Sequence, residues 1–247
     1  MTEQAGLADR SRGHWLSGCS GSAAGTVQDK DLFCHDEPAH VVLLCAPGSY
    51  DSSQAEQMMI VAGDYKVNVF EGTEQYAKPQ RLVSHPLYNR STNNADIMLI
   101  KLRAPMVLNK YVSLAPLPRQ GTGVVEGHVC RVSGWGYHSL GGGQGPVSLR
   151  TVTVPIVSAA RCNSSDSFDG NITANMICAG YRTGGKDACK GDSGGPLVCS
   201  GRIYGVVSWG NGCGDAKFPG VYTAVSRFRR WIDQTIYGSF RRCSTNW

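Results

Sequence analysis

The sequence predicts an all-β protein that ends in one helix. Two features of the composition support the strands: glycine makes up 31 of the 247 residues, and only 17% of the residues are charged. Soluble proteins average about 7% glycine and about 25% charged residues. Abundant glycine with few charges is typical of short strands joined by tight turns, and it argues against a coiled coil or a disordered chain.

Short runs of strand-forming residues recur at regular intervals after residue 57. They cover 58–62, 97–102, 128–135, 152–157, 196–199, 203–209 and 220–225. Clusters rich in glycine or asparagine separate them, a rhythm that predicts a β-sandwich or barrel. Residues 1–56 show no sustained period beyond an apolar burst at 40–45. We therefore expect two β units behind an atypical front end.

The terminal helix is predicted by one apolar stripe. Val225, Phe228, Trp231, Ile232 and Ile236 follow the spacing i, i+3, i+6, i+7 and i+11. Residues at this spacing share one face of an α-helix. We expect the helix to pack that face against the β core.

The net charge of +5 arises from 24 Lys and Arg against 19 Asp and Glu. Most cations are scattered, but Arg227, Arg229 and Arg230 stand close together near the end. No aromatic platform or nucleic-acid motif accompanies them, so we interpret them as a solvated face and expect no nucleic-acid partner. Electrostatic binding of sulfated glycans is a weaker alternative. The longest strongly apolar run, 41–45, is far below the ~18 residues of a membrane span, so we expect no membrane partner either.

Ten cysteines stand singly in the sequence, without a C-x-x-C pair or a Cys/His cluster at zinc spacing. Disulfides formed in an oxidising compartment are the favoured interpretation. Three N-glycosylation sequons, at Asn89, Asn163 and Asn171, agree with a secreted glycoprotein, although each triplet alone is a weak signal. Residues 1–18 carry acidic side chains and lack an apolar core, so we do not interpret them as a signal peptide.

Ser193 lies in the most informative segment of the chain. A serine flanked by glycines can sit on a tight turn with its hydroxyl exposed and backbone N–H groups free to bind an oxyanion. Residues 191–195 also fit the G-x-S-x-G pattern of α/β-hydrolases, in which the catalytic histidine follows the serine. The last histidine of this chain, His138, precedes Ser193, which excludes that interpretation.

Five motifs occur in order along the chain: ADIMLIKL at 95–102, VSGWG at 132–136, GDSGGPLVC at 191–199, VVSWG at 206–210 and PGVYT at 219–223. In these motifs and their order the chain resembles the trypsin-like serine proteases of the chymotrypsin fold, from about residue 57 to the terminal helix. The resemblance implies two antiparallel β-barrels followed by a C-terminal helix. The family's C-G-G-S-L segment is absent, so we expect an incomplete N-terminal barrel.

The resemblance also divides the chain into parts. We expect residues 1–56 to be an atypical, poorly ordered N-terminal segment and residues 57–247 to be a trypsin-like serine protease domain. Within that domain, the remnant of the N-terminal barrel covers about 57–110, and the C-terminal barrel with its helix covers about 111–240.

The catalytic groups follow from the same resemblance. Ser193 would be the nucleophile, and the N–H groups of Gly191 and Ser193 would form the oxyanion hole. Asp96 matches the buried carboxylate that orients the catalytic histidine. Asp192 matches the aspartate that pairs, in the family, with the amine freed by activation cleavage.

The substrate pocket is implied in the same way. Asp187 precedes the nucleophile by six residues and matches the base of the primary pocket, where a carboxylate selects Arg or Lys. Ser208, Trp209, Gly210 and Gly220 would form its walls and the substrate edge, with the glycines leaving room for a long side chain. The alternative for Asp187 is a solvated loop acid, which its spacing from the nucleophile argues against.

The cysteine positions agree with the family. The resemblance implies three disulfides, Cys130–Cys199, Cys162–Cys178 and Cys189–Cys213. It gives no partner for four further cysteines, namely Cys19, Cys34, Cys45 and Cys243.

Residues 63–74 resemble the calcium loop of the family. The side chains of Asp64, Glu71 and Glu74 and the main-chain carbonyls of Lys66 and Val69 would be the ligands. Hard oxygen ligands of this kind suit calcium. A lysine inside the loop leaves an ion pair with the acids as the alternative.

Two features of the family are absent from the sequence. The register places the catalytic histidine around 44–51, where the sequence reads LCAPGSYD. The nearest histidine, His40, is a weak candidate, and His85 matches a surface-loop position. No I-V-G-G activation motif occurs, although MIVAG at 59–63 is superficially similar. Residues 1–56 therefore derive from an alternative or misjoined first exon, or the chain is a diverged, non-catalytic homologue.

The sequence thus predicts a trypsin-like serine endopeptidase that hydrolyses peptide bonds after Arg or Lys through an acyl-enzyme at Ser193. Because no general base is identifiable, we expect this form to be inactive, and the alternative is a non-catalytic homologue that acts as a binding module. We expect a secreted monomer whose partners are protein or peptide substrates and protein protease inhibitors. Catalysis should need no cofactor, and calcium is expected only as a structural ion.

Overall fold

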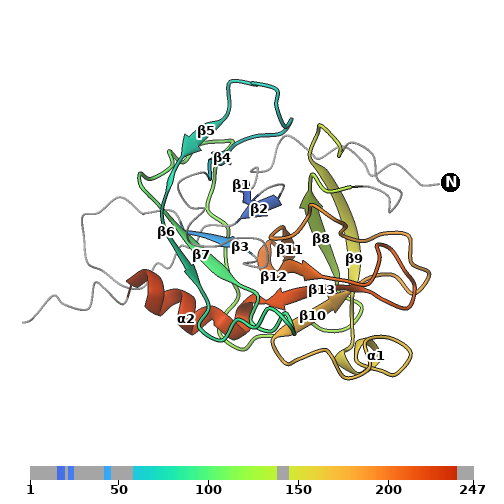
Figure 1. Cartoon of the computed structure of the whole chain (residues 1–247). Coiled ribbons are helices and arrows are strands. Elements are labelled where there is room, and N and C mark those ends of the chain that lie inside the picture. Colours follow the sequence, from blue (N-terminus) through green and yellow to red (C-terminus); the bar gives the residue numbers. More distant parts are fainter. Residues whose placement is uncertain (1–15, 20–21, 25–41, 46–57, 138–144, 238–247) are drawn as a thin grey trace, which may run out of the picture.

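The computed structural model describes residues 16–19, 22–24, 42–45, 58–137 and 145–237 (Figure 1). Apart from two helices the described elements are strands, so the predicted all-β fold with a C-terminal helix is confirmed. The strands are β1 (Leu16–Cys19), β2 (Ser22–Ala24), β3 (Val42–Cys45), β4 (Ile60–Ala62), β5 (Gln75–Ala77), β6 (Pro79–Ser84), β7 (Met98–Leu102), β8 (Val129–Gly134), β9 (Arg150–Val157), β10 (Met176–Ala179), β11 (Pro196–Cys199), β12 (Arg202–Trp209) and β13 (Gly220–Ala224). The helices are α1 (Ala159–Cys162) and α2 (Val225–Tyr237).

The C-terminal half is a closed barrel of six strands in the order β10-β13-β12-β11-β8-β9. All neighbours are antiparallel, and β9 closes the barrel by pairing with β10, with Val157 opposite Cys178. Val132, Val154 and Leu197 fill its centre. Closure leaves no unpaired strand edge in this half of the molecule.

The N-terminal half contains two antiparallel sheets, with strand orders β2-β1-β4-β5 and β3-β7-β6. Ile60 and Ala62 of β4 pack against Met98 and Ile100 of β7, so the two sheets share one core. No strand pairing joins them within the part of the chain described, and this open arrangement matches the predicted incomplete N-terminal barrel.

Three strands come from residues 1–56. Leu43 of β3 lies opposite Ile100 of β7, and Ser17 of β1 lies opposite Val61 of β4. Both pairings cross the domain boundary predicted at residue 57, which itself stays a prediction. The rest of the 1–56 segment lies outside the described residues.

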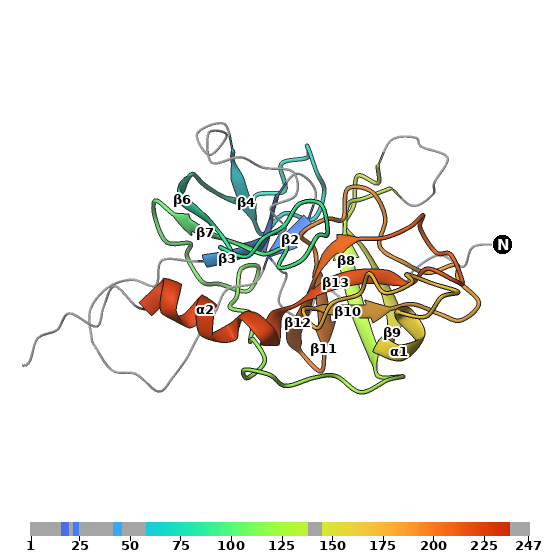
Figure 2. The ribbon, with the colours of Figure 1, turned by 60° about the horizontal axis from the view of Figure 1, so that its bottom comes forward.

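Helix α2 carries the predicted apolar stripe and joins the two halves. Phe228 and Ile232 are buried together with Leu99 from β7 and with Ile203 and Val206 from β12. Figure 2 shows α2 extending from beneath β3 and β7 to β12. Burying a side chain of this size is worth about 1.5–3 kcal/mol, so the stripe stabilises the contact between the halves as well as the helix.

Three disulfides brace the C-terminal half. Cys130–Cys199 joins β8 to β11, Cys162–Cys178 joins α1 to β10, and Cys189–Cys213 joins two loops. These are the three pairings that the family resemblance implied. Each is typically worth about 2–4 kcal/mol. The side chains of Cys19, Cys34, Cys45 and Cys243 lie outside the described part of the structure.

Neither helix has the length and hydrophobicity that spanning a membrane requires, among the residues described.

Gly205 provides a test of the barrel packing. A Cβ at this position would lie 2.9 Å from the Cβ of Tyr222 and 3.0 Å from the Cβ of Leu197. Because overpacking a core costs about 1–3 kcal/mol, Gly205→Ala should lower the free energy of unfolding by that amount in urea titrations. Gly123→Ala is the matched control, since a Cβ there meets nothing within 4 Å. Equal midpoints for the two variants would contradict the packing.

Candidate active site

Asp96 is a buried charge that lies just before β7, with 3% of its surface exposed. The Ser208 hydroxyl donates to its Oδ2 at 2.6 Å, and the Thr223 hydroxyl donates to its main-chain carbonyl at 2.8 Å. A buried carboxylate requires such partners because desolvation otherwise destabilises its charged form. Ser208 and Thr223 belong to β12 and β13, so the barrel fixes an acid supplied by the other half.

The backbone before Asp96 is strained. Ala95 has a φ of 53°, and the N–H of Ile97 donates to the Ala95 carbonyl at 2.8 Å. A left-handed φ at a non-glycine residue typically costs about 1–3 kcal/mol and is concentrated at functional sites. This tight turn sets the direction in which the Asp96 carboxylate leaves the chain.

Ser193 is exposed at a turn between two glycines of positive φ, Gly191 at 94° and Gly194 at 85°. These angles favour glycine because a Cβ would clash with the backbone. The Gly194 N–H donates to the Val207 carbonyl at 2.9 Å, and the Val207 N–H donates to the Gly195 carbonyl at 2.8 Å. The turn is therefore fastened to β12 one residue before Ser208, which places Ser193, Ser208 and Asp96 in one connected site.

Asp192 anchors the same turn from its other side. Its Oδ1 accepts from the Gly136 N–H at 2.8 Å, and its Oδ2 accepts from the Cys189 N–H at 2.9 Å. Burial raises the pKa of the Asp192 carboxyl, and the two N–H donors oppose that rise. No lysine, arginine or histidine of the described chain forms an ion pair with it, so backbone N–H groups hold this carboxylate.

Gly136 is required by that contact. A Cβ at Gly136 would lie 2.5 Å from the Asp192 Cγ and 2.7 Å from the Asp192 nitrogen. A Cβ at Gly191 would in turn lie 3.0 Å from the Gly136 Cα. The segment that follows β8 and the turn that carries Ser193 thus approach each other at distances that only glycine allows.

Asp187 lies in a second niche built from backbone. Its Oδ1 accepts from the Ala188 N–H at 2.8 Å, and its Oδ2 accepts from the Gly214 N–H at 2.9 Å. Burial raises the pKa of Asp187 to about 6, the two N–H groups oppose this rise, and the negative charge of Asp192 adds to it. A Cβ at Gly220, the first residue of β13, would lie 2.5 Å from Oδ1. Asp187 and the start of β13 therefore approach each other at a distance that only glycine allows at residue 220.

Tyr222 belongs to this niche and was not identified from the sequence. Its ring is fully buried, and its hydroxyl has no hydrogen-bond partner among the described groups. The hydroxyl lies 3.1 Å from the position where Gly220 would carry a Cβ, which is also the position beside Asp187. Burial raises its pKa well above 10, and the charges of Asp187 and Asp192 add to the rise. An unpaired buried hydroxyl is costly, and this one lies close to the Asp187 carboxylate.

The remaining predicted pocket residues lie beside the niche. Ser208 and Trp209 are the last two residues of β12, and Gly210 follows them exposed. The Trp209 ring packs edge-on against Phe168, with ring centroids 4.8 Å apart. Because β12 pairs with β13, these residues and Gly220 share one end of the barrel.

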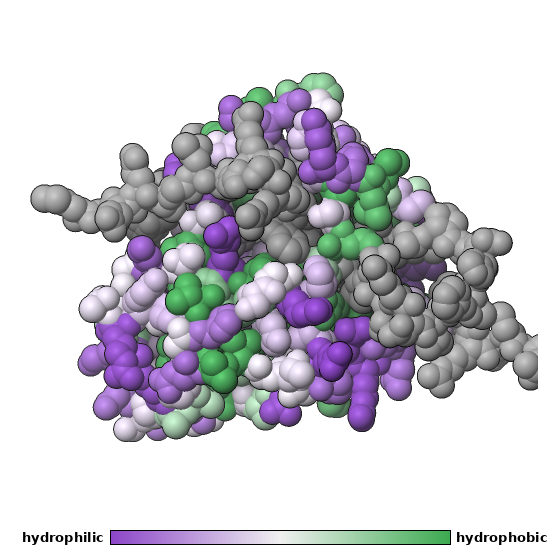
Figure 3. Space-filling view, turned by 180° about the vertical axis from the view of Figure 1, so that it is seen from behind, coloured by the Kyte–Doolittle hydropathy of each residue, from purple (hydrophilic) through white to green (hydrophobic). Residues whose placement is uncertain are grey.

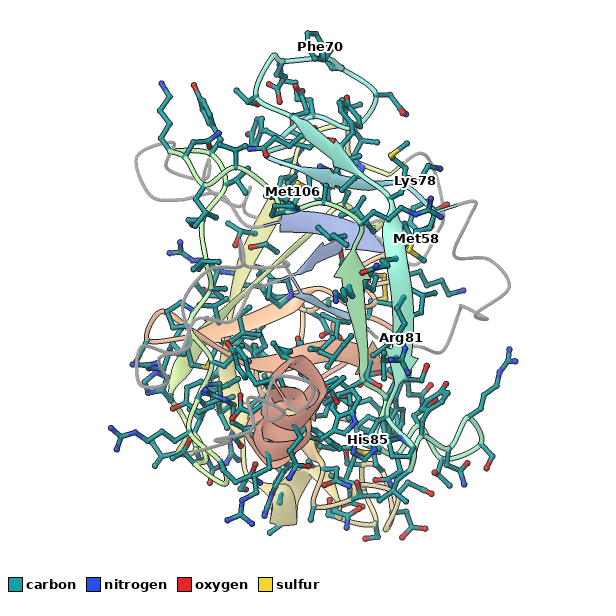
Figure 4. The ribbon with its side chains drawn as sticks, turned by 90° about the vertical axis from the view of Figure 1, so that its left-hand side faces the viewer. Met58, Phe70, Lys78, Arg81, His85 and Met106 are labelled. Atoms are coloured by element: carbon teal, nitrogen blue, oxygen red, sulfur yellow. A yellow bond between two sulfur atoms is a disulfide. The ribbon has the colours of Figure 1, made fainter. Side chains whose placement is uncertain are left out.

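The side chains of the two described histidines contact other parts of the molecule. His85 packs against Phe228 and Trp231 of α2, with ring centroids 4.8 Å apart in each case, and Figure 4 shows it beside that helix. Burial lowers its pKa. His128 lies 3.2 Å from the Ser200 hydroxyl on the surface.

The other candidate positions for the base are only partly described. His40 and residues 46–51 lie outside the described chain. The described end of β3, Cys45, lies opposite Met98, at the same end of β7 as Asp96.

The acidic loop after β4 gathers three carboxylates. Oxygens of Asp64, Glu71 and Glu74 lie within 4.8 Å of one another. The pKa of Asp64 is raised by its burial and then by the charges of Glu74 and Glu71, and its Oδ1 is buried without a hydrogen-bond partner in the described chain. Lys66 forms no ion pair with these acids among the residues described, and its carbonyl accepts from the Val69 N–H at 3.1 Å.

The acidic loop is attached to the C-terminal half through its backbone. The Trp135 indole N–H donates to the Tyr65 carbonyl at 3.2 Å, and the Val67 N–H donates to the Val147 carbonyl at 2.9 Å. In Figure 4 the loop tip, marked by Phe70, lies at the opposite end of the molecule from α2. Three carboxylates gathered in this way are the kind of oxygen ligands that a hard cation takes.

Comparison with known proteins shows the family to which this chain belongs. The family model for Trypsin matches residues 39–232. Trypsin-3 of Salmo salar is 46% identical over 180 residues, covering 73% of this chain and 74% of the relative. Trypsin of Sus scrofa is 43% identical over 180 residues, with 73% and 76% covered, and trypsin I-P1 of Gallus gallus is 42% identical over 194 residues, with 78% and 75% covered. The chain belongs to the trypsin family of serine proteases.

Proposed function

We propose that this protein is a trypsin-like serine endopeptidase that hydrolyses peptide bonds after Arg or Lys, with Ser193 as nucleophile. The observation that carries the proposal is the Asp187 carboxylate, which is buried beside Gly220 and the Tyr222 hydroxyl and forms no ion pair with a cation of the described chain. A long cationic side chain would meet both a charge and a polar acceptor there. A desolvated carboxylate forms strong charge-assisted hydrogen bonds with a guanidinium.

The chemistry follows from the remaining groups. Ser193 Oγ attacks the carbonyl carbon while a general base takes its proton. The N–H groups of Gly191 and Ser193 stabilise the oxyanion, and the base returns the proton to the leaving amine as the C–N bond breaks. Water then hydrolyses the acyl-enzyme by the same steps in reverse order. Asp96, held by Ser208 at 2.6 Å, orients the base.

A binding module is the second candidate. The positions that should carry the base, 44–51, contain no histidine in the sequence, and His85 packs against α2 instead of Asp96. Loss of one member of the catalytic triad typically lowers kcat by a factor of about 10⁴ to 10⁶. A protein with the pocket intact but without a base would capture basic side chains or protease inhibitors without cleaving them.

Hydrolysis of an arginyl amide by oxidatively folded protein distinguishes these functions. We expect the kcat of the chain itself to lie about 10⁴- to 10⁶-fold below the 1–10³ s⁻¹ of ordinary enzymes. Replacing residues 1–56 by the corresponding region of the Sus scrofa trypsin should restore that rate, and Ser193→Ala in the graft should abolish it. A folded graft without Arg-directed turnover would favour the binding module. Ordinary turnover by the ungrafted chain would identify an unrecognised base, with His40 as the first candidate.

The pH dependence of ligand binding tests the pocket without catalysis. Burial raises the pKa of Asp187 to about 6, so the free carboxyl is neutral below that pH and charged above it. The Kd of benzamidine, measured by calorimetry, should be constant above pH 7 and rise about tenfold per pH unit well below 6. Asp187→Asn should bind weakly with a flat profile. A wild-type profile that stays flat would contradict the assignment of Asp187 as the cation-binding base.

We propose a structural calcium ion in the acidic loop. Asp64, Glu71 and Glu74 bring three carboxylates together, and the carbonyls of Lys66 and Val69 are candidate ligands on the same loop. A cation would remove the mutual repulsion that, after burial, raises the pKa of Asp64. Catalysis itself needs no metal in this proposal.

Thermal unfolding tests the ion. Calcium at 100 times its Kd stabilises a folded protein by about 2.7 kcal/mol, which corresponds to a Tm increase of roughly 5–10 °C at this size. Asp64→Asn should lose that increase yet match or exceed the wild-type Tm in chelator, because it removes one of the repelling charges. Asp166→Asn, an exposed acid outside the loop, should keep the calcium response. A wild-type Tm that does not respond to calcium would contradict the site.

Secretion and glycosylation complete the proposal. Trypsin relatives and three disulfides support an oxidising compartment. Among the three sequons Asn89 is the favoured acceptor, because it is exposed and its Oδ1 accepts from the Ser91 hydroxyl at 2.6 Å, which leaves Nδ2 without a hydrogen bond to the described residues. The Nδ2 of Asn171 instead donates to the Phe168 carbonyl at 2.8 Å, and Asn163 is half-buried.

Protein substrates and protein inhibitors are the proposed partners, and the protein is proposed to be a monomer.

A further inference from the structure

One segment before β8 is hydrogen-bonded to the first turns of α2. The Gly121 N–H donates to the Ser226 carbonyl at 2.9 Å. The side chain of Gln120 bonds at both ends, donating to the Arg227 carbonyl at 3.0 Å and accepting from the Arg230 N–H at 2.8 Å. Segment and helix therefore form one rigid surface.

Arginine side chains from β12 and α2 contact this segment. An Arg202 guanidinium N–H donates to the Leu117 carbonyl at 3.1 Å, and an Arg229 guanidinium N–H donates to the Pro118 carbonyl at 3.3 Å. Arg119 is the next residue of the segment and is exposed. We call the resulting patch the arginine surface; it comprises Arg119, Arg202, Arg227, Arg229 and Arg230.

The charge of the arginine surface is hardly compensated. Arg229 pairs with Asp233 at 2.8 Å. The other four arginines, all exposed, form no ion pair with any described acid. They carry four positive charges in a chain whose net charge is +5. Figure 3 shows hydrophilic residues on both lower flanks of the rear face, of which the right-hand flank is on the side of α2.

The positive charges of the arginine surface lower the stability of the folded protein. Like charges held close together repel, and α2 has no acidic residue in its first turn to offset its cations. Arg227 lies in the first turn of α2, where the positive end of the helix dipole disfavours a cation. A polyanion bound at the surface would remove both penalties.

The chemistry of the patch selects among polyanions. Arginine presents a planar fork that binds sulfate or phosphate oxygens in pairs. A membrane surface is disfavoured because none of the exposed large apolar side chains described lies on 117–121 or on the first two turns of α2. A nucleic acid is disfavoured because the aromatic residues of those turns, Phe228 and Trp231, pack inward and offer no stacking platform.

We propose that the arginine surface binds a sulfated polysaccharide. Its charges are spread over an open face instead of converging on one pocket, so they fit a repeating anionic polymer better than a single anion. The groups involved are separate from Asp187 and Ser193, and binding does not depend on the proposed peptidase activity.

Three exposed arginines give a clean test. The side chains of Arg119, Arg227 and Arg230 make no hydrogen bond or ion pair with the described chain, so Arg119→Gln/Arg227→Gln/Arg230→Gln should leave the bonds between segment and helix intact. The matched control is Arg81→Gln/Arg131→Gln/Arg150→Gln, which removes the same charge from exposed sites on β6, β8 and β9. Circular dichroism and the urea midpoint check that both variants are folded.

Binding of a heparin oligosaccharide is measured by calorimetry at about 0.15 M salt, together with the NaCl concentration that elutes the protein from immobilised heparin. Wild-type protein should bind, the Arg119/Arg227/Arg230 variant should bind at least about tenfold more weakly, and the control should change by less than about threefold. Desulfated heparin should bind more weakly than heparin. Equal losses in the two variants, or tighter binding of a single-stranded oligonucleotide than of heparin at the same salt, would overturn the proposal.

Discussion

The burial of Asp96 is the constraint on which the site depends. Its carboxylate is supplied by one half of the molecule and hydrogen-bonded by Ser208 from the other, at 2.6 Å. A charge with 3% of its surface exposed is tolerated only while such partners remain in place. The relative position of the two halves is therefore fixed where Ser193 is fastened to β12, and the strained turn at Ala95 follows from the same requirement.

Backbone N–H groups stabilise the two carboxylates near Ser193 in sequence. Asp187 and Asp192 are each held by two of them, and each lies against a glycine that leaves no room for a side chain, Gly220 and Gly136 respectively. Main-chain donors cannot titrate, and they are fixed by the strands and disulfides around them. The Asp187 carboxylate therefore stays oriented while remaining unpaired by any described cation, as a site for a cationic ligand requires.

The sequence predicted those features that are encoded by residues close together in the chain, and it missed those that depend on contacts between distant residues. The stripe through Phe228 and Ile232 predicted α2 because a helix is specified by neighbours three and four residues apart. Ser193 and Asp187 were predicted from the resemblance of one continuous segment to the family, with a six-residue spacing between them. Tyr222 and Gly136 were missed because their roles arise from contacts with Asp187 and Asp192 that no local pattern encodes. Strands β1, β2 and β3, of three or four residues each, are too short to show a period.

The position of α2 in the sequence has a consequence for how the protein is made. The two halves share a core that Phe228 and Ile232 complete, yet these residues follow every described strand in the sequence. Chains fold from the N-terminal end as they emerge, and partly folded intermediates expose apolar surface. Until α2 leaves the ribosome, the apolar faces of β7 and β12 lack their common cover. A nascent chain of this protein must therefore keep both sheets apart from other apolar surfaces until α2 is available.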